Sequence, residues 1–206
     1  VMEFQQRSFS CLGVCADVTE PASVQAMVAQ ALEHYGQIDI LVNNAGVSWG
    51  APVEEMPLER WRYVLEVNVT GAFLVSQAVG RHMLERRVGK IINIASLAGL
   101  LGMPAEVLSA VGYSASKGAL IALTRDLAVK WAPHGISVNA IAPGFFPTRL
   151  SEAVIQRSET AILAGIPLGR LGQPDDIKGL AVFLAAPASA YITGQVFPLD
   201  GGASAW

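Results

Sequence analysis

The chain has 206 residues, of which 52% are hydrophobic and 15% charged, with a formal net charge of -3 and a sequence pI near 5.6. This composition predicts a single globular domain, residues 1–206, with a large buried core. It offers no basic stripe for a phosphate backbone, so it argues against nucleic acid as a partner and favours a small molecule.

The chain also lacks the features of a membrane or secreted protein. Its most apolar stretch, 179–197, is interrupted by Pro187, Ser189 and Thr193, and the core of that stretch, 180–186, falls well short of the ~20 residues that a membrane helix needs. The first residues lack the basic-then-apolar order of a secretory signal, so we expect a cytoplasmic protein. His34, His82 and His134 are scattered without close partners, and no metal site is expected.

Short β-branched runs alternate with longer helical patterns along the chain, which is typical of βαβ units. In chain order, the predicted elements are a strand at 12–16, a helix at about 21–35, a strand at 38–42, helices over about 58–68 and on to 86, a strand at 90–95, a helix from 113 to about 132, a strand at 136–141, a short amphipathic piece at about 151–164, a helix starting at 173 and a strand at 196–199. They predict an α/β fold, a doubly wound parallel sheet with helices on both faces.

Polar residues follow several of the predicted strands. These residues are Asp17, the run Asn43-Asn44-Ala45-Gly46, Ser96, and Pro143-Gly144. Ligands of doubly wound sheets bind at the carboxyl ends of the strands, so we expect these groups to converge on one site.

Tyr113 and Lys117 are four residues apart in a predicted helix, so their side chains are expected on one face. A lysine cation near a phenol favours the phenolate, and such a tyrosine can act as a general acid or base at neutral pH. For the pair alone, a surface helix with a solvated lysine is the simpler interpretation.

Together these motifs resemble the short-chain dehydrogenase/reductase family over essentially the whole chain. The shared features occur in the family's order: Asp17 after a strand, Asn43-Asn-Ala-Gly46, Ser96 ahead of Tyr113-x-x-x-Lys117, and Asn139-x-x-x-Pro143-Gly144 leading to Thr148. The resemblance is closest to the 3-oxoacyl-carrier-protein reductase and gluconate 5-dehydrogenase branches. It implies a Rossmann-like fold and an NAD- or NADP-dependent enzyme that interconverts a secondary alcohol and a ketone.

The resemblance implies a catalytic tetrad of Asn68, Ser96, Tyr113 and Lys117. Tyr113 would exchange a proton with the substrate oxygen, and Ser96 would hold the same oxygen by a hydrogen bond. Lys117 would bind the nicotinamide ribose and lower the pKa of Tyr113, while Asn68 would anchor a water that relays protons. The competing interpretations are a turn cap for Ser96 and a helix-kinking amide for Asn68.

The resemblance also implies the residues that bind the cofactor. They are Asp17 and Val18 on the adenine side, Asn43, Ala45 and Gly46 along the dinucleotide, Tyr113 and Lys117, Ile141 on the nicotinamide ring, and Pro143, Gly144 and Thr148 near its carboxamide. Asn43 is equally suited to bracing the sheet, and Pro143-Gly144 to a plain turn. The choice between NAD and NADP is not predicted.

The family's glycine-rich turn for the pyrophosphate is missing from these residues, as is the strand, helix and strand of roughly 40 residues around it. We expect the sequence to be a fragment of a longer enzyme. The alternative is a non-catalytic or cofactor-deficient subunit that acts only in assembly. By resemblance the protein forms a homotetramer or homodimer, through the helices around 58–86 and 115–132 and through the C-terminal strand.

The segment between Ser96 and Tyr113 is somewhat longer than is common in the family, which leaves the substrate open. Its residues 103–111 are mostly apolar with one acid, Glu106, which argues mildly against an anionic substrate. An apolar pocket and simple core packing are equally good interpretations for a set of nearby side chains: Trp49, Leu100, Leu101, Met103, Phe145 and Phe146.

Overall fold

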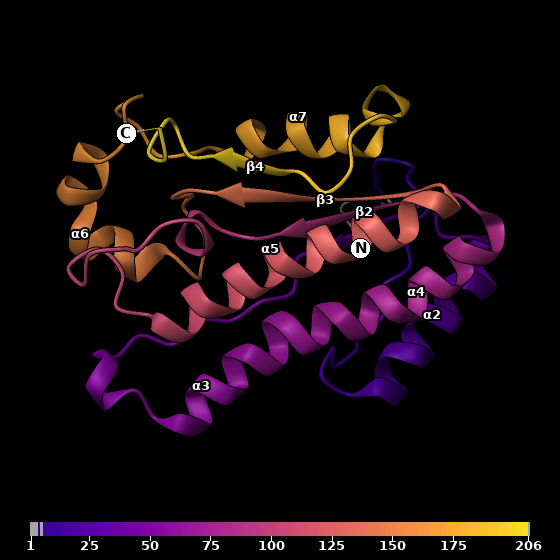
Figure 1. Ribbon diagram of the computed structural model, residues 1–206, viewed down its shortest axis with the longest axis horizontal. Coiled ribbons are helices and arrows are strands. Elements are labelled where there is room, and N and C mark those ends of the chain that lie inside the picture. Colours follow the sequence, from indigo (N-terminus) through magenta and orange to yellow (C-terminus); the bar gives the residue numbers. More distant parts are fainter. Residues whose placement is uncertain (1–3, 5, 206) are drawn as a thin grey trace.

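A computed structural model of the chain describes residue 4 and residues 6–205. The described residues form a four-stranded parallel sheet in the order β1-β2-β3-β4 (Figure 1). The strands are β1 (Ile40–Asn43), β2 (Gly89–Ile94), β3 (Ile136–Pro143) and β4 (Val196–Leu199). Because all four run in the same direction, their carboxyl ends lie along one edge of the sheet.

Helices cover both faces of this sheet (Figure 1). The longer ones are α2 (Pro21–Tyr35), α3 (Leu58–Leu65), α4 (Ala72–Arg86), α5 (Val111–Trp131), α6 (Glu152–Ala164) and α7 (Pro174–Ala185), with a π-helical segment η2 (Glu66–Gly71) between α3 and α4. Short 3-10 turns are η1 (Val53–Glu55), η3 (Leu97–Gly99), η4 (Ala132–His134) and η5 (Pro187–Ser189). The predicted α/β sheet with helices on both faces is confirmed.

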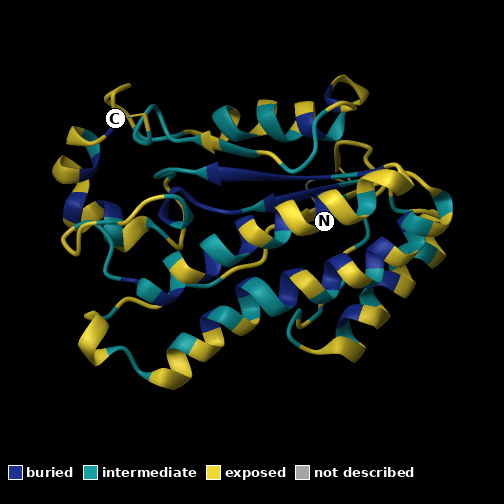
Figure 2. Ribbon diagram, viewed as in Figure 1, coloured by how far each residue is buried: buried dark blue, intermediate teal, exposed yellow. Residues whose placement is uncertain are grey.

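The two central strands are almost fully buried, as Figure 2 shows by their dark blue arrows. One face packs under α2, α4 and α5 in a cluster that contains Val28, Met83, Ile91 and Val138. The other face packs under α7, where Ile92 and Ile141 meet Leu184. Strands buried on both faces require apolar side chains at nearly every position, which explains their short β-branched runs.

Most predicted elements are confirmed. For α2 and β4, the first and last residues are the predicted ones. The predicted strand at 12–16 is wrong, because residues 11–16 carry no regular secondary structure. A strand needs a neighbour to bond with, and among the described residues β1 pairs only with β2. In the described part of the chain, no helix combines the length and apolarity needed to cross a membrane.

Met83 on α4 is the clearest test of this packing. Its side chain is 0% exposed and lies directly against Gly89, where a Cβ would collide with it. We expect Met83→Ala to lower the free energy of unfolding by about 2–5 kcal/mol, because it leaves a cavity between α4 and the sheet. Urea denaturation of the full-length protein measures this change.

Leu168→Ala is the control for that variant, since Leu168 is 67% exposed. Its cost should stay within about 0.5 kcal/mol. Equal losses in the two variants would contradict the assigned core.

Candidate active site

Tyr113 and Lys117 lie on the first turns of α5 and face the same way, as their spacing predicts. The Lys117 ammonium lies 5.6 Å from the centroid of the Tyr113 ring. Lys117 is 4% exposed, and its Nζ donates a hydrogen bond of 2.7 Å to the carbonyl of Ile94 at the end of β2. The simpler interpretation of a solvated surface lysine is therefore wrong.

Ser96 lies just past the end of β2 and lines one cavity with Tyr113, and its side chain lowers the pKa of that tyrosine. Its Oγ also accepts a hydrogen bond of 3.2 Å from the Ala98 amide and so caps η3. The cap and the contact with Tyr113 thus coexist in one side chain. The turn that Ser96 caps holds its hydroxyl beside the phenol.

The pKa values of this pair correct one expectation. Burial raises the pKa of Tyr113 above its ordinary value, and the hydrogen bond from Ser96 offsets part of that rise. Burial also lowers the pKa of Lys117 from 10.5 to about 8. The expected lowering of the Tyr113 pKa by Lys117 is therefore not seen, because desolvation of the buried phenol dominates the shift and the opposing effect comes from Ser96.

Asn68 lies in the π-helical segment η2 and is 1% exposed. Its Oδ1 accepts a hydrogen bond of 2.8 Å from the Val47 amide, while its Nδ2 donates to the Val47 carbonyl and to Ser116 Oγ, each at 2.9 Å. Asn68 therefore ties the loop after β1 to α5. Its side-chain donors are engaged, so a role in holding a water stays a prediction.

Asn43 at the end of β1 braces the sheet. Its Nδ2 donates to Ser76 Oγ at 2.9 Å and to Asn93 Oδ1 at 2.8 Å, and Asn93 in turn donates to Thr124 Oγ1 at 2.8 Å. This buried chain of amides joins β1, α4, β2 and α5. The bracing interpretation of Asn43 is the one that the contacts support.

Gly46 approaches the centre of the site. A Cβ placed on it would lie 3.3 Å from Asn68 Oδ1 and 3.6 Å from Lys117 Nζ. Ala45 and Gly46 are exposed, so main chain and not side chain faces the open side of the site here.

Asp17 and Val18 lie in the turn before α2. Asp17 is exposed, and its Oδ1 accepts hydrogen bonds from the amide and hydroxyl of Thr19, which hold the pKa of the carboxyl below its usual value. Val18 packs over Gly71, where a Cβ would meet its Cγ2 at 2.7 Å. These contacts place both residues beside the end of η2, in a turn stabilised by Thr19.

The residues expected around the nicotinamide lie in three different environments. Ile141 is 0% exposed and packs in the core under α7, so its placement favours packing over contact with a ligand. Pro143 and Gly144, past the core of β3, line one cavity together with Tyr113. Thr148 is exposed on the following turn, with its Oγ1 2.9 Å from Ser151 Oγ.

A cavity of about 90 Å³ opens beside the reactive side chains, and we call it the Tyr113 cavity. Its lining includes Ser48, Ser96, Met103, Tyr113, Phe145 and Leu150. Ser48 and Leu150 were not predicted as site residues. Only their neighbours Gly46 and Thr148 belong to recognisable motifs, so the sequence carried no separate signal for them.

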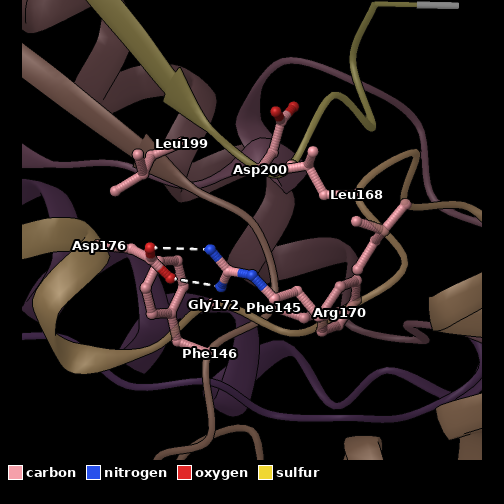
Figure 3. A pocket seen from close by; sticks show the side chains of 10 residues that line it. Phe145, Phe146, Leu168, Arg170, Gly172, Asp176, Leu199 and Asp200 are labelled. Carbon is pink, nitrogen blue, oxygen red and sulfur yellow. Dashed lines mark hydrogen bonds and ion pairs between the residues drawn. The ribbon is translucent and has the colours of Figure 1, made fainter.

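A second cavity, the Arg170 cavity, shares Phe145 with the Tyr113 cavity (Figure 3). Arg170 clamps Asp176 with contacts of 2.7 and 3.0 Å, and this pairing lowers the Asp176 pKa to about 2. Asp176 also accepts from the Gln173 amide at 2.8 Å in a capping box, so the clamp holds the start of α7 to the preceding loop. The pair is thus explained by helix capping.

These residues fit the nicotinamide and ribose part of a dinucleotide cofactor. The Lys117 ammonium has three N–H donors. In the described part of the structure one of them bonds the Ile94 carbonyl, so the other two can donate to a ribose hydroxyl. Because Gly46 has no side chain, no Cβ crowds the Lys117 ammonium at this point. Within residue 4 and residues 6–205, no group of three or more ligating side chains is placed to hold a metal ion.

The buried ammonium makes the stability of the protein depend on pH. Between about pH 8 and 10.5 the unfolded chain binds a proton at Lys117 that the folded chain does not, so the free energy of unfolding rises with pH in this window. We expect the free energy of unfolding of wild type, measured relative to that of Lys117→Met, to increase by roughly 2 kcal/mol from pH 7 to pH 10. Denaturation of both proteins across this range measures it.

Lys130→Met is the matched control, because Lys130 is on the same helix with its side chain 61% exposed. Its difference from wild type should stay constant over the same range. A constant difference for Lys117→Met as well would contradict the burial of its charge.

Comparison with known proteins places this geometry in a family. The family described as enoyl-(acyl carrier protein) reductase matches residues 1–204. A 3-oxoacyl-[acyl-carrier-protein] reductase of Synechocystis is 40% identical over 203 residues, which cover 98% of this chain and 79% of that protein. A 2-dehydro-3-deoxy-D-gluconate 5-dehydrogenase of Bacillus subtilis is 45% identical over 191 residues, covering 90% and 72%.

Solved structures agree with these matches. The crystal structure of a gluconate 5-dehydrogenase from Burkholderia cenocepacia in complex with NADP and tartrate superposes with a TM-score of 0.93 at 38% identity. The match covers 100% of this chain and 80% of that protein, so the chain spans about four-fifths of its relative's length. The chain belongs to the short-chain dehydrogenase/reductase family of NAD(P)-dependent oxidoreductases.

Proposed function

We propose that this chain catalyses the reversible reduction of a ketone to a secondary alcohol with NAD or NADP, and that Tyr113 exchanges the proton. The observation that carries the proposal is that Ser96 and Tyr113 line the same cavity, with the Lys117 ammonium 5.6 Å from the centroid of the Tyr113 ring. A proton donor and a second hydrogen-bond donor that point at one oxygen are what carbonyl reduction requires.

The chain's own residues would act on the substrate oxygen. In reduction, Tyr113 donates its proton to the carbonyl oxygen as negative charge develops there, and Ser96 holds the same oxygen in place. In alcohol oxidation the tyrosine takes up the hydroxyl proton. The raised pKa of Tyr113 keeps the phenol protonated, which suits the proton donor of the reductive direction.

A nicotinamide ring, when bound, supplies or accepts the hydride. Lys117 would hold its ribose, and Pro143, Gly144 and the main chain at Ala45 and Gly46 would line its place. Asp17 and Val18 are proposed for the adenine side and Thr148 for the carboxamide side. The buried contacts of Asn43 and Ile141 support structural roles for these two residues within the same site.

A non-catalytic subunit, the alternative predicted from the sequence, is not favoured. The relatives described above are named as reductases or dehydrogenases, and Ser96, Tyr113 and Lys117 lie together as such chemistry needs. These names include both acyl-carrier and sugar-acid substrates. Similarity therefore leaves the substrate open.

We further propose that residues 1–206 belong to one dinucleotide-binding and catalytic domain, of which they lack the N-terminal part, and that the protein is a cytoplasmic homotetramer or homodimer. Exposed apolar side chains on α3, α4 and α5 support a helical interface: Leu58 is 57% exposed, Phe73 42% and Val129 77%. Such side chains on neighbouring helices are typical of surfaces that associate.

Tyr113→Phe tests the proposed chemistry. Removing the phenolic oxygen should lower kcat by at least ~100-fold, because the proton donor is lost while the ring remains. The affinity for NADPH should change little, which fluorescence titration of the full-length protein measures.

Tyr63→Phe serves as the control, since Tyr63 on α3 is 50% exposed. It should leave both turnover and cofactor affinity unchanged. Full activity in Tyr113→Phe would refute the role of this tyrosine.

A further inference from the structure

A second, largely apolar cavity, which we call the Val107 cavity, adjoins the Tyr113 cavity. It measures about 170 Å³, and it shares Leu97, Met103, Gly144 and Phe145 with the Tyr113 cavity. Beyond these shared walls, it is lined mainly by side chains such as Leu101, Val107 and Ile162. For comparison, an engineered apolar cavity of about 150 Å³ binds benzene.

The described walls of the two cavities carry no cationic side chain that could receive a carboxylate. Among the described residues that line either cavity, none is Lys, Arg or His. Lys117 lies below the site with its Nζ on the Ile94 carbonyl, and the Arg60 guanidinium lies 4.1 Å from the centroid of the Trp49 ring. Glu106 and Arg157 line a separate surface depression.

The one charged side chain among the described residues that line these two cavities is negative. Asp200 lines the Val107 cavity, and its carboxylate oxygens accept from the amides of Gly202 at 3.0 Å and Ser204 at 2.9 Å. A second anion beside it would be buried without a partner, which is strongly unfavourable.

The amino end of α6 is the remaining feature that attracts anions, because helix dipoles favour negative charge there. Here the amides of Ser151 and Glu152 both donate to the Thr148 carbonyl, at 3.1 and 2.9 Å. Glu152 itself supplies a carboxylate in the first turn. Two amides at this helix end are therefore already bonded within the protein, and its first turn carries a carboxylate of its own.

We propose that the substrate is a neutral ketone or secondary alcohol that carries an apolar chain, and not a sugar acid. The inference rests on the proposed function and assigns its substrate class. The oxygen lies at Ser96 and Tyr113, and the apolar chain extends past Met103 and Phe145 into the Val107 cavity.

The experiment compares the reduction of 2-butanone, 2-hexanone, 2-octanone and 5-keto-D-gluconate by the full-length protein with NADPH and NADH. We expect kcat/KM to rise roughly 4-fold for each methylene that enters the cavity. We expect 5-keto-D-gluconate to be at least ~100-fold poorer than 2-octanone, because its carboxylate finds no partner. Equal or better turnover of 5-keto-D-gluconate would overturn the proposal.

A binding measurement separates this inference from the proposed chemistry. Calorimetry on Tyr113→Phe saturated with NADPH should detect binding of 2-octanone and none of 5-keto-D-gluconate. If no ketone is reduced by wild type, the proposed function is wrong, and the binding result still decides the substrate class. Binding of the sugar acid alone would refute the inference.

Leu150→Arg adds the missing cation at the rim of the Tyr113 cavity, where Leu150 is 49% exposed. It should lower the preference for 2-octanone over 5-keto-D-gluconate by at least ~10-fold, since a hydrogen bond to a charged group is worth that much. Leu168→Arg is the matched control, on an exposed leucine that lines the Arg170 cavity instead. If Leu150→Arg and Leu168→Arg show the same preference for 2-octanone over 5-keto-D-gluconate, Leu150 is not part of the wall that contacts the substrate.

Discussion

The hydrogen bond from the Lys117 ammonium to the Ile94 carbonyl is the contact on which the rest of the site depends. At 2.7 Å it joins the second turn of α5 to the end of β2 and gives a buried cation a partner. Burial disfavours that cation, as the lowered pKa shows, so a lysine here is retained at a cost to stability. With α5 held in this way, Tyr113 one turn earlier lies beside Ser96, which follows the same strand.

Two sets of buried amides hold the remaining parts in register with this contact. Asn43 and Asn93 join β1, β2 and the helices beside them, and Asn68 joins the loop after β1 to α5. A buried amide is costly unless all its groups are paired, so each network permits one arrangement of its elements. The π-helical turn at η2 is the local irregularity through which Asn68 is placed, as is common at functional sites.

Sequence patterns predicted the sheet and the Tyr113–Lys117–Ser96 group because these depend on local spacing and on strand ends. The strand at 12–16 was wrong, because a strand needs a neighbour and local pattern carries no information about one. The direction of the Tyr113 pKa shift was also wrong, since it depends on how many atoms surround the phenol. Leu150 and Ser48 were missed because a cavity wall is assembled from segments with no common motif.

Reaction and substrate are therefore set by different parts of the molecule. The reacting groups lie on α5 and at the end of β2, where parallel strands and buried amides leave little freedom. The walls come from the loop that contains Met103 and from α6, and α6 packs against Val107 and Phe145 in a small cluster around Ile162. Changes in these walls alter charge and volume without disturbing Lys117 or Tyr113. Relatives with the same reacting groups can thus differ in substrate. The walls formed by the described residues, which include no Lys, Arg or His, bear more directly on the substrate of this chain than overall identity does.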